Sequence, residues 1–286
     1  RCSQGVFQNV KMPSKGSTIK FKAHSKQERK MFVMYSDFEA TLRKLKDYIK
    51  NTEKTTFEEA HDPCSYCIVT KSEYEDYNEE IIVFSDPDPL IVTKQYVDDL
   101  FRIHAKMMKH YESKQHPIDM SEADEKKFKN STHCHVCQHK LQWGHKTNYP
   151  VRDHDHTKVN QNFRGAACNS CNRNYYERSR KVAVLTHNSK NYDMSFFLLD
   201  VIKMSEKTQP IAENLEKFKT LITEKFVFLD SCQFLTASLE NLAENLRRKG
   251  SQHFKRLQKE FPDKYTLLME KAVYPYQYCS SYDVFR

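Results

Sequence analysis

Two Cys-x-x-Cys pairs enclose the residues of this chain that are best suited to chemistry. Cys134 and Cys137 form the first pair, and Cys168 and Cys171 form the second. Each pair can present two thiolates to one ion, and four thiolates in this spacing are the ligand set of a structural zinc site. The linker between the pairs, residues 138–167, is longer than that of an ordinary zinc ribbon. The sequence therefore predicts a Zn²⁺ site with further structure built on it.

An Asp-His-Asp-His run lies inside that linker. Because side chains alternate along a strand, Asp153 and Asp155 are predicted to share one face, and His154 and His156 the other. A histidine that titrates near neutral pH can activate water, and a hard cation can stabilise a leaving oxygen. These are the needs of phosphodiester hydrolysis. A zinc module that only binds DNA would need no such run, and both interpretations are open on the residues alone.

This cysteine region resembles the His-Me finger (HNH) nucleases of the recombination endonuclease VII type. The resemblance implies a ββα unit pinned by a four-cysteine zinc. It implies that Asp153 binds Mg²⁺ or Mn²⁺, that His154 deprotonates the attacking water, and that Asn172 is the second metal ligand. It also implies that His156 supports the site near the phosphate and that Arg164 meets the DNA backbone.

Acidic residues follow two apolar runs elsewhere in the chain. "MFVMYSDFEATL" predicts a buried strand that delivers Asp37 and Glu39 near its end, and "HNSKNYD" places Asp193 where a helix begins. On its own, either motif is more often part of a solvated turn than of a catalytic site. Together they resemble the first and second motifs of the 3′→5′ exonuclease domain of family B DNA polymerases, which has an RNase H-like fold. The resemblance implies a two-metal site of Mg²⁺ or Mn²⁺ on these three carboxylates.

The order of the motifs resembles the protein-primed polymerases of Polinton (Maverick) transposons and adintovirus-like viruses, over residues 17–280. This implies that Asp230 supports the fold or the substrate instead of binding metal, and that four residues position single-stranded DNA, namely Asn188, Tyr192, Ser238 and Leu239. The family's third exonuclease motif, Yx₃D, is absent, because Tyr278 and Asp283 have the wrong spacing. The polymerase signatures Dx₂SLYP and YxDTDS are absent too. We therefore expect a nuclease region without a polymerase active site.

The remaining sequence predicts an α/β (α+β) fold that carries these motifs. Strands are expected at Ser17–Ala23, over "CSYCIVT" and "EEIIVFSD", which would pair with the first acidic strand, and over "KVAVLT" and "KFVFLDS". Helices are expected from Thr93 to Ser113, from Ser121–Glu122 onward, over "SLENLAENLRR" and near Phe254–Phe261. A further helix follows "HNSKNYD", with its apolar positions predicted at Phe196, Phe197, Leu199 and Ile202.

Four segments follow from this organisation. We expect a basic lead-in at 1–30, the first part of an exonuclease domain at 31–120, an inserted zinc-stabilised HNH module at 121–178, and the second part of the exonuclease domain at 179–286. Two smaller features favour a structural interpretation. Cys64 and Cys67 would face opposite sides of a strand, which argues against a second zinc site. His104, on the predicted helix, suits the core.

Composition sets the broad class. The chain has 286 residues and carries 46 Lys+Arg against 38 Asp+Glu, a net charge of +8, which makes DNA a plausible partner. Nine cysteines in three CxxC pairs and three single residues favour metal binding in a reducing compartment over disulfides. The longest apolar run, Met31–Tyr35, has five residues, so no membrane segment is expected.

The expected location is intracellular, and the nucleus or a viral replication site in a eukaryote. The chain begins at Arg1, and we expect it to be part of a longer protein that includes the missing polymerase portion. Two alternatives are open. One is a free-standing HNH endonuclease that uses the exonuclease fold as a scaffold. The other is a catalytically inactive DNA-binding module.

Overall fold

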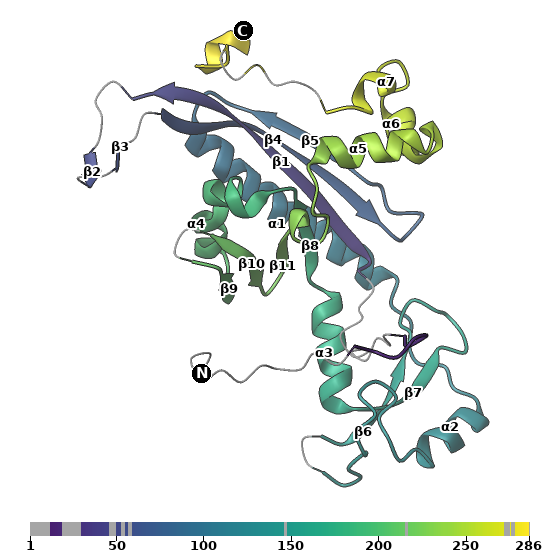
Figure 1. The fold of residues 1–286 in the computed structure, drawn as a ribbon. Helices are drawn as coiled ribbons and strands as arrows, with labels where there is room; N and C mark the ends of the chain where they lie inside the picture. The colour runs from purple at the N-terminus through teal and green to yellow at the C-terminus, as the bar shows by residue number, and fades with distance from the viewer. Residues whose placement is uncertain are drawn as a thin grey trace.

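A seven-stranded mixed sheet forms the centre of the chain (Figure 1). The computed structural model describes residues 12–18, 30–45, 50–52, 55–56, 59–145, 148–214, 217–271, 275 and 278–285. The sheet has the strand order β5-β4-β1-β8-β11-β10-β9. Its strands are β1 (Phe32–Lys44), β4 (Glu59–Ser72), β5 (Ile81–Ser85), β8 (Val182–Thr186), β9 (Thr208–Ala212), β10 (Phe218–Thr223) and β11 (Phe226–Asp230). A small separate hairpin joins β2 (Lys50–Thr52) to β3 (Thr55–Thr56).

Strand directions divide the sheet into two halves. β1, β4 and β5 pair antiparallel, which confirms the predicted pairing of the first three strands. β8 runs parallel to β1 on one side and to β11 on the other. β11, β10 and β9 complete the sheet in antiparallel pairs. Parallel neighbours need long crossover connections, and helices within the β1-to-β8 and β8-to-β11 connections supply them.

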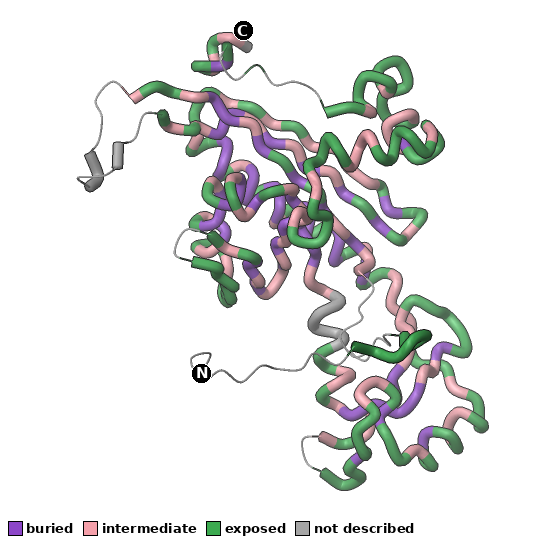
Figure 2. Tube along the Cα trace, viewed as in Figure 1, coloured by how far each residue is buried: buried purple, intermediate pink, exposed green. Residues whose placement is uncertain are grey.

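Helices α1 (Pro89–Ser113) and α4 (Met194–Met204) bury their apolar stripes against one face of the sheet. α1 begins four residues before the predicted start because the Asp88 side chain accepts a hydrogen bond from Leu90 N at 2.9 Å and Pro89 suits the first turn. Buried residues line the contact between these helices and the sheet (Figure 2). Its largest fully buried side chains are Tyr66, Tyr96, Phe197, Phe226 and Phe228.

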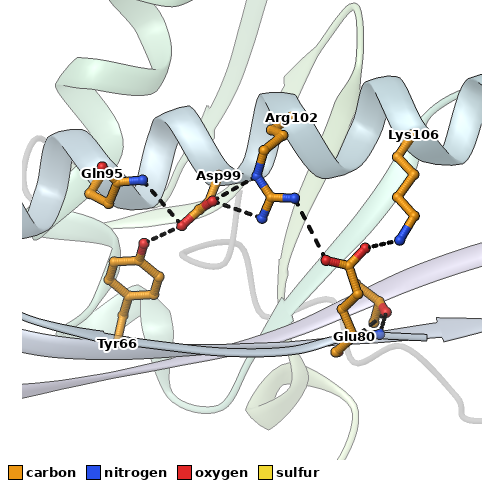
Figure 3. Close-up of polar contacts among 7 residues, drawn as sticks. Tyr66, Glu80, Gln95, Asp99, Arg102 and Lys106 are labelled. Carbon is orange, nitrogen blue, oxygen red and sulfur yellow. Dashed lines mark hydrogen bonds and ion pairs between the residues drawn. The ribbon is translucent and has the colours of Figure 1, made fainter. Parts of the chain in front are cut away.

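A polar network also ties α1 to β4 (Figure 3). Asp99, buried in the contact, accepts a hydrogen bond from Tyr66 Oη at 2.6 Å and two from Arg102, at 3.0 and 2.8 Å. Arg102 also pairs with Glu80, which Lys106 contacts as well. A buried carboxylate is costly unless it is paired and hydrogen-bonded. Asp99 has both kinds of partner, so the network fixes how α1 crosses the sheet.

A second, smaller unit lies beyond the end of the sheet and joins it through α1 and α3 (Figure 1). It contains α2 (Glu122–Lys129), β6 (Pro150–His154), β7 (Phe163–Cys168) and α3 (Asn169–Ser179). The predicted start of α2 is confirmed, because Ser121 and Asp124 form a capping box. This unit has its own buried cluster, separate from the core of the sheet: Phe128, Cys134, Leu141, Ala166, Ala167 and Cys168.

The C-terminal part forms three short helices, α5 (Leu239–Arg248), α6 (Lys255–Glu260) and α7 (Tyr265–Leu268). Among the described residues of the second half of the chain, 3₁₀ turns lie at η3 (Ser189–Asn191), η4 (Ser231–Gln233), η5 (Ser251–Phe254) and η6 (Tyr282–Phe285). Arg256 donates to the Thr70 carbonyl at 2.8 Å and anchors α6 to β4. α5 has no buried residue.

Several sequence predictions need correction. Asp37 and Glu39 do not end their strand, because β1 continues to Lys44 through a register shift after Glu39. Leu199 is not an inward position of α4 but is 66% exposed, and Leu198 is buried in its place. β9 and β10 were not predicted at all. The strand expected at Ser17–Ala23 lies mostly outside the described residues. None of the described helices combines the length and the apolar content needed to cross a membrane.

Candidate metal centre and carboxylate site

The four predicted cysteines meet at one point. Their sulfur atoms all lie within 4.8 Å of one another, and Cys137 Sγ is 4.0 Å from Cys168 Sγ. Zinc–sulfur bonds of about 2.3 Å in a tetrahedron imply sulfur–sulfur distances of about 3.8 Å. The four cysteines are therefore placed to hold a metal ion, and their spacing is compatible with zinc. The third pair, Cys64 and Cys67, is not part of this group.

Backbone amides support the first knuckle. Cys168 N lies 3.3 Å from Cys134 Sγ, and Cys134 is completely buried. Burial raises the pKa of this thiol, but amide groups directed at the sulfur outweigh it and bring the pKa down to about 7. N–H groups aimed at a sulfur stabilise the thiolate, which is the form that binds metal. This holds for Cys134 alone in the first knuckle, because burial raises the pKa of Cys137.

Asp153 lies beside the metal centre as a buried ion pair. Its Oδ2 accepts hydrogen bonds from His135 Nε2 at 2.7 Å and from Arg164 Nε at 2.9 Å. Burial raises the pKa of Asp153, but these two partners outweigh it and hold the pKa below its ordinary value. Sequence reasoning named Arg164 only as a DNA contact and missed His135. Its place between the two zinc-knuckle cysteines was the available signal.

The prediction that Asp153 and Asp155 share a strand face is wrong. β6 ends at His154, and Asp155 lies in the turn that follows, where it accepts hydrogen bonds from Thr157 N at 3.1 Å and Thr157 Oγ1 at 2.6 Å. The turn forms because an aspartate can bond to the backbone two residues ahead. His154 and His156 do lie together, with ring centroids 3.9 Å apart.

His154 Nε2 is buried and has no hydrogen-bond partner among the described residues. A buried polar atom without a partner is costly, and such atoms gather at functional sites. Burial and then the nearby His154 lower the pKa of His156. Asn172 lies in the first turn of α3, half-buried, and makes no hydrogen bond to Asp153 among the described residues. The order β6, β7, α3 is that of the expected ββα unit.

The second predicted site depends on the difference in length between two strands. β8 pairs with β1 only as far as Tyr35, so the backbone of β1 has no ladder partner on that side further along. Asp193 Oδ1 accepts a hydrogen bond from Phe38 N at 3.3 Å in this region. Phe38 stands between Asp37 and Glu39 in the sequence. The carboxylate that begins α4 therefore lies beside the two that β1 carries.

The pKa of each of the three carboxyl groups is raised by burial, and the charge of Asp37 adds to the shift of the other two. Burial, and then the charge of Asp37, raise the pKa of Asp193 to about 7. Burial also raises the pKa of Glu39, and Asp37 again adds to it. Asp37 is exposed as a residue, but the protein around its carboxyl displaces enough water to raise its pKa. Like charges with little water between them are the condition that a divalent cation relieves.

These carboxylates suit a hard cation in their chemistry, because carboxylate oxygens are the ligands of Mg²⁺ and Mn²⁺. They do not surround a single point as the cysteines do. Within the described part of the chain, the four cysteines are the one group of three or more ligands gathered closely enough to hold an ion. A two-metal site shares its carboxylates between two ions, so the looser arrangement is compatible with that geometry.

Hydrogen bonds to Asp230 hold the "HNSKNYD" segment in place. This buried carboxylate accepts hydrogen bonds from Asn188 N at 2.8 Å, Lys190 N at 3.1 Å and Cys232 N at 2.9 Å, so Asp230 supports the fold, which is one of the two roles expected for it. Asn188 has a left-handed backbone, with φ of 63°. Tyr192 Oη lies 2.8 Å from His61 Nδ1, a contact that the sequence did not suggest.

Ser238 and Leu239 lie at the start of α5. The Ser238 side chain accepts a hydrogen bond from Asn241 N at 3.2 Å and caps the helix, while Leu239 is 48% exposed. Two basic side chains near the carboxylates were also missed by sequence reasoning. Lys271 and His187 both lower the pKa of Asp37, with a smaller effect than the burial that raises it. His187 is the first residue of the "HNSKNYD" motif, which was the available signal for it, whereas Lys271 belongs to no motif and only the fold could reveal it.

No protein-family model, curated protein or solved structure matches this chain. The fold and the two sites define a mixed α/β protein with a four-cysteine centre in its smaller unit and a carboxylate cluster on its sheet. Its function follows from those residues and their geometry.

Proposed function

We propose that this chain is the metal-dependent DNA nuclease region of a family B DNA polymerase. It would combine an RNase H-like 3′→5′ exonuclease fold with an inserted HNH-type zinc module. The hydrogen bond between Asp193 and Phe38 N carries the proposal, because it joins the second acidic motif to the first. The sheet supports it as well, with three antiparallel strands followed by two that run parallel to the first.

Asp37 and Glu39 would hold one Mg²⁺ or Mn²⁺ ion, and Asp193 would help to hold a second. Bound there, such ions activate water and stabilise the departing 3′ oxygen of DNA. The chain's own residues prepare the site. Phe38 N fixes one oxygen of Asp193, and the burial of Asp193 keeps water from screening its charge. A cation is more stable in such a site than in bulk water, because the fold has already brought the negative charges together.

DNA is the proposed substrate and partner. The chain carries a net charge of +8, which favours a polyanion. Tyr192 lies one residue before Asp193, and its ring offers a stacking surface for a base at a frayed 3′ end. Its hydroxyl contacts His61 on the neighbouring strand, so the ring is held in place before DNA arrives. Asn188, in the turn that Asp230 holds in place, would contact the same DNA strand.

The inserted module is the proposed site of a second hydrolysis. Zn²⁺ on Cys134, Cys137, Cys168 and Cys171 would hold the ββα unit together, and His154 would act as its general base. The unpartnered Nε2 of His154 supports this role. Asp153 does not fit a hard cation as it stands, because Arg164 and His135 occupy its Oδ2.

Two alternative functions predict different results in one experiment. A free-standing HNH endonuclease would use the sheet only as a scaffold, and an inactive module would bind DNA without cutting it. The protein is incubated with 5′-labelled single-stranded DNA, plasmid and branched DNA in Mn²⁺, as wild type and as Asp37→Ala, Asp193→Ala and His154→Ala.

Loss of 3′ trimming in the first two variants only would support the exonuclease site. Loss of nicking in His154→Ala only would support the HNH site. If nicking occurs without any trimming, the free-standing endonuclease is favoured. DNA binding without cleavage by the wild type would favour the inactive module.

A further inference from the structure

The Asp153–Arg164 pair lies where the proposed HNH site would need a free carboxylate. A β-bulge brings the two side chains together. Asp153 pairs with Gly165 across the hairpin, and His154 pairs with Phe163, so Arg164 is the extra residue of the bulge. A bulge re-aims the side chain of its extra residue. Here the guanidinium is aimed at Asp153 Oδ2.

The oxygen is fully used by these contacts. Arg164 Nε and Nη2 lie 2.9 and 2.8 Å from Oδ2, and His135 Nε2 lies 2.7 Å from the same atom. A hard cation must approach a carboxylate oxygen to about 2.1 Å. A cation at Oδ2 would therefore have to displace Arg164, and a cation at either oxygen of Asp153 would be repelled by the guanidinium charge. Without a change at Arg164, a cation binds Asp153 poorly.

Arg164 has an alternative partner in the proposed substrate. Its side chain is 30% exposed, so a ligand can reach it, whereas the Asp153 side chain is 4% exposed. A guanidinium binds phosphate oxygens with two parallel hydrogen bonds, as it binds a carboxylate. A DNA phosphate can compete for Arg164 from the solvent side.

We propose that the Arg164 guanidinium blocks cation binding at Asp153 until a DNA phosphate binds Arg164 and draws it away from Asp153. Phosphate binding to Arg164 and cation binding to Asp153 are then coupled, and each increases the affinity of the other. This inference rests on the proposed nuclease role of the module. It adds that the module binds its cation only together with DNA.

The hairpin offers a matched control. Arg152 is the neighbour of Asp153 on β6, and it pairs with Glu125 at 2.9 and 2.6 Å, away from Asp153. Arg164→Gln and Arg152→Gln remove the same charge from the same hairpin. Arg164→Lys keeps the charge but loses the second nitrogen. All variants are made in the full chain with Asp37→Asn and Asp193→Asn, so that the carboxylate site on the sheet binds no ion.

Mn²⁺ binding is measured from the electron paramagnetic resonance of the free ion, with and without a short DNA duplex. The signal from DNA with an Asp153→Asn variant is subtracted. We expect Arg164→Gln to bind Mn²⁺ about tenfold more tightly than its parent without DNA, Arg152→Gln to match the parent, and Arg164→Lys to lie between. DNA should raise the Mn²⁺ affinity of the parent and of Arg152→Gln, but not that of Arg164→Gln.

Two results overturn the inference in different ways. If the parent binds Mn²⁺ through Asp153 equally well with and without DNA, and Arg164→Gln does not change this, then Arg164 is no gate but the module's nuclease role stands. If no variant binds Mn²⁺ through Asp153 even with DNA, the proposed role of the module fails and the inference fails with it.

Discussion

Asp193 is a carboxylate in surroundings that disfavour its charge. It is 4% exposed, Phe38 N donates to its Oδ1, and burial with the charge of Asp37 raises its pKa to about 7. Natural proteins tolerate such a residue when a ligand compensates for it. A cation at this site would lower that pKa again, so the residue links proton binding to metal binding.

The pH dependence of stability follows from the sign of this shift. The folded pKa lies above the ordinary value, so the folded state holds the proton more tightly, and the associated stability is present below about pH 4 and is lost as the pH rises to about 7. Without metal, the wild type should lose about 2–3 kcal/mol of unfolding free energy between pH 5 and pH 8 that Asp193→Asn does not lose.

Urea unfolding at the two pH values checks this prediction, and Asp200→Asn is the control. Asp200 lies on the same helix, pairs with Lys203 at the surface and should follow the wild type. Equal pH dependence of wild type and Asp193→Asn would mean that Asp193 is solvated like an ordinary surface carboxylate.

At the scale of elements, α1 is held on the sheet by packing and by the network around Asp99. Tyr66 donates to that carboxylate from β4, and Tyr66 is itself buried. Removing the hydroxyl deprives Asp99 of one donor while Arg102 remains. We expect Tyr66→Phe to cost about 1–2 kcal/mol of unfolding free energy. Denaturant unfolding measures it, with Tyr35→Phe, at a half-exposed tyrosine of β1, as the control; equal stabilities would show that the network adds nothing.

The hairpin of the smaller unit predicts a second effect at this scale. A Cβ at Gly165 would lie 2.9 Å from His135 Cγ, closer than carbon atoms approach. Gly165→Ala should push His135 away from Asp153 and destabilise the smaller unit. Hydrogen exchange of β6 and β7 should rise, while that of β1 and β8 should not. Unchanged exchange in β6 and β7 would show that the hairpin accommodates the methyl group.

The elements with strong local patterns were predictable from the sequence. β1 alternates apolar and polar residues, α1 repeats its apolar residues at helical spacing, and Ser121 begins α2 as a capping box. β9 could not be predicted, because all five of its residues are exposed and only the sheet edge of β10 makes it a strand. The burial of Leu198 in place of Leu199 could not be predicted either. Both residues are leucine, and only the packing of α4 against its neighbours decides which of them is buried.

The sites show the same division. CxxC spacing predicted the cysteine centre, since each pair acts locally and zinc chemistry is specific. The contact of Asp193 with Phe38 was expected only as convergence of two motifs; its cause, a β8 that is shorter than β1, is a property of the sheet. The pairing of Asp153 with Arg164 could not be foreseen, because it depends on a bulge that no residue type signals.

At the scale of the whole molecule, two separate cores imply two units that respond differently to metal. The core of the sheet contains none of the four cysteines, whereas the smaller cluster includes Cys134 and Cys168. Zinc should therefore hold together the smaller unit alone. We expect one zinc per chain by atomic absorption. Chelation should expose 121–178 to proteases and leave the sheet resistant.

Cys168→Ser should reproduce the effect of the chelator, and Cys67→Ser should not, because Cys67 lies on β4 outside the metal group. A chain that loses its zinc and keeps both units equally resistant to proteases would contradict this division.

The central claim is that Asp37, Glu39 and Asp193 together bind the divalent cations of a nuclease. Anomalous scattering from crystals soaked in Mn²⁺ tests it most directly. The proposed site predicts Mn²⁺ peaks in contact with these carboxylates, two of them about 4 Å apart when DNA is bound. Saturating Mn²⁺ that leaves no peak beside Asp37 and Asp193, while zinc scatters from the four cysteines, would contradict it.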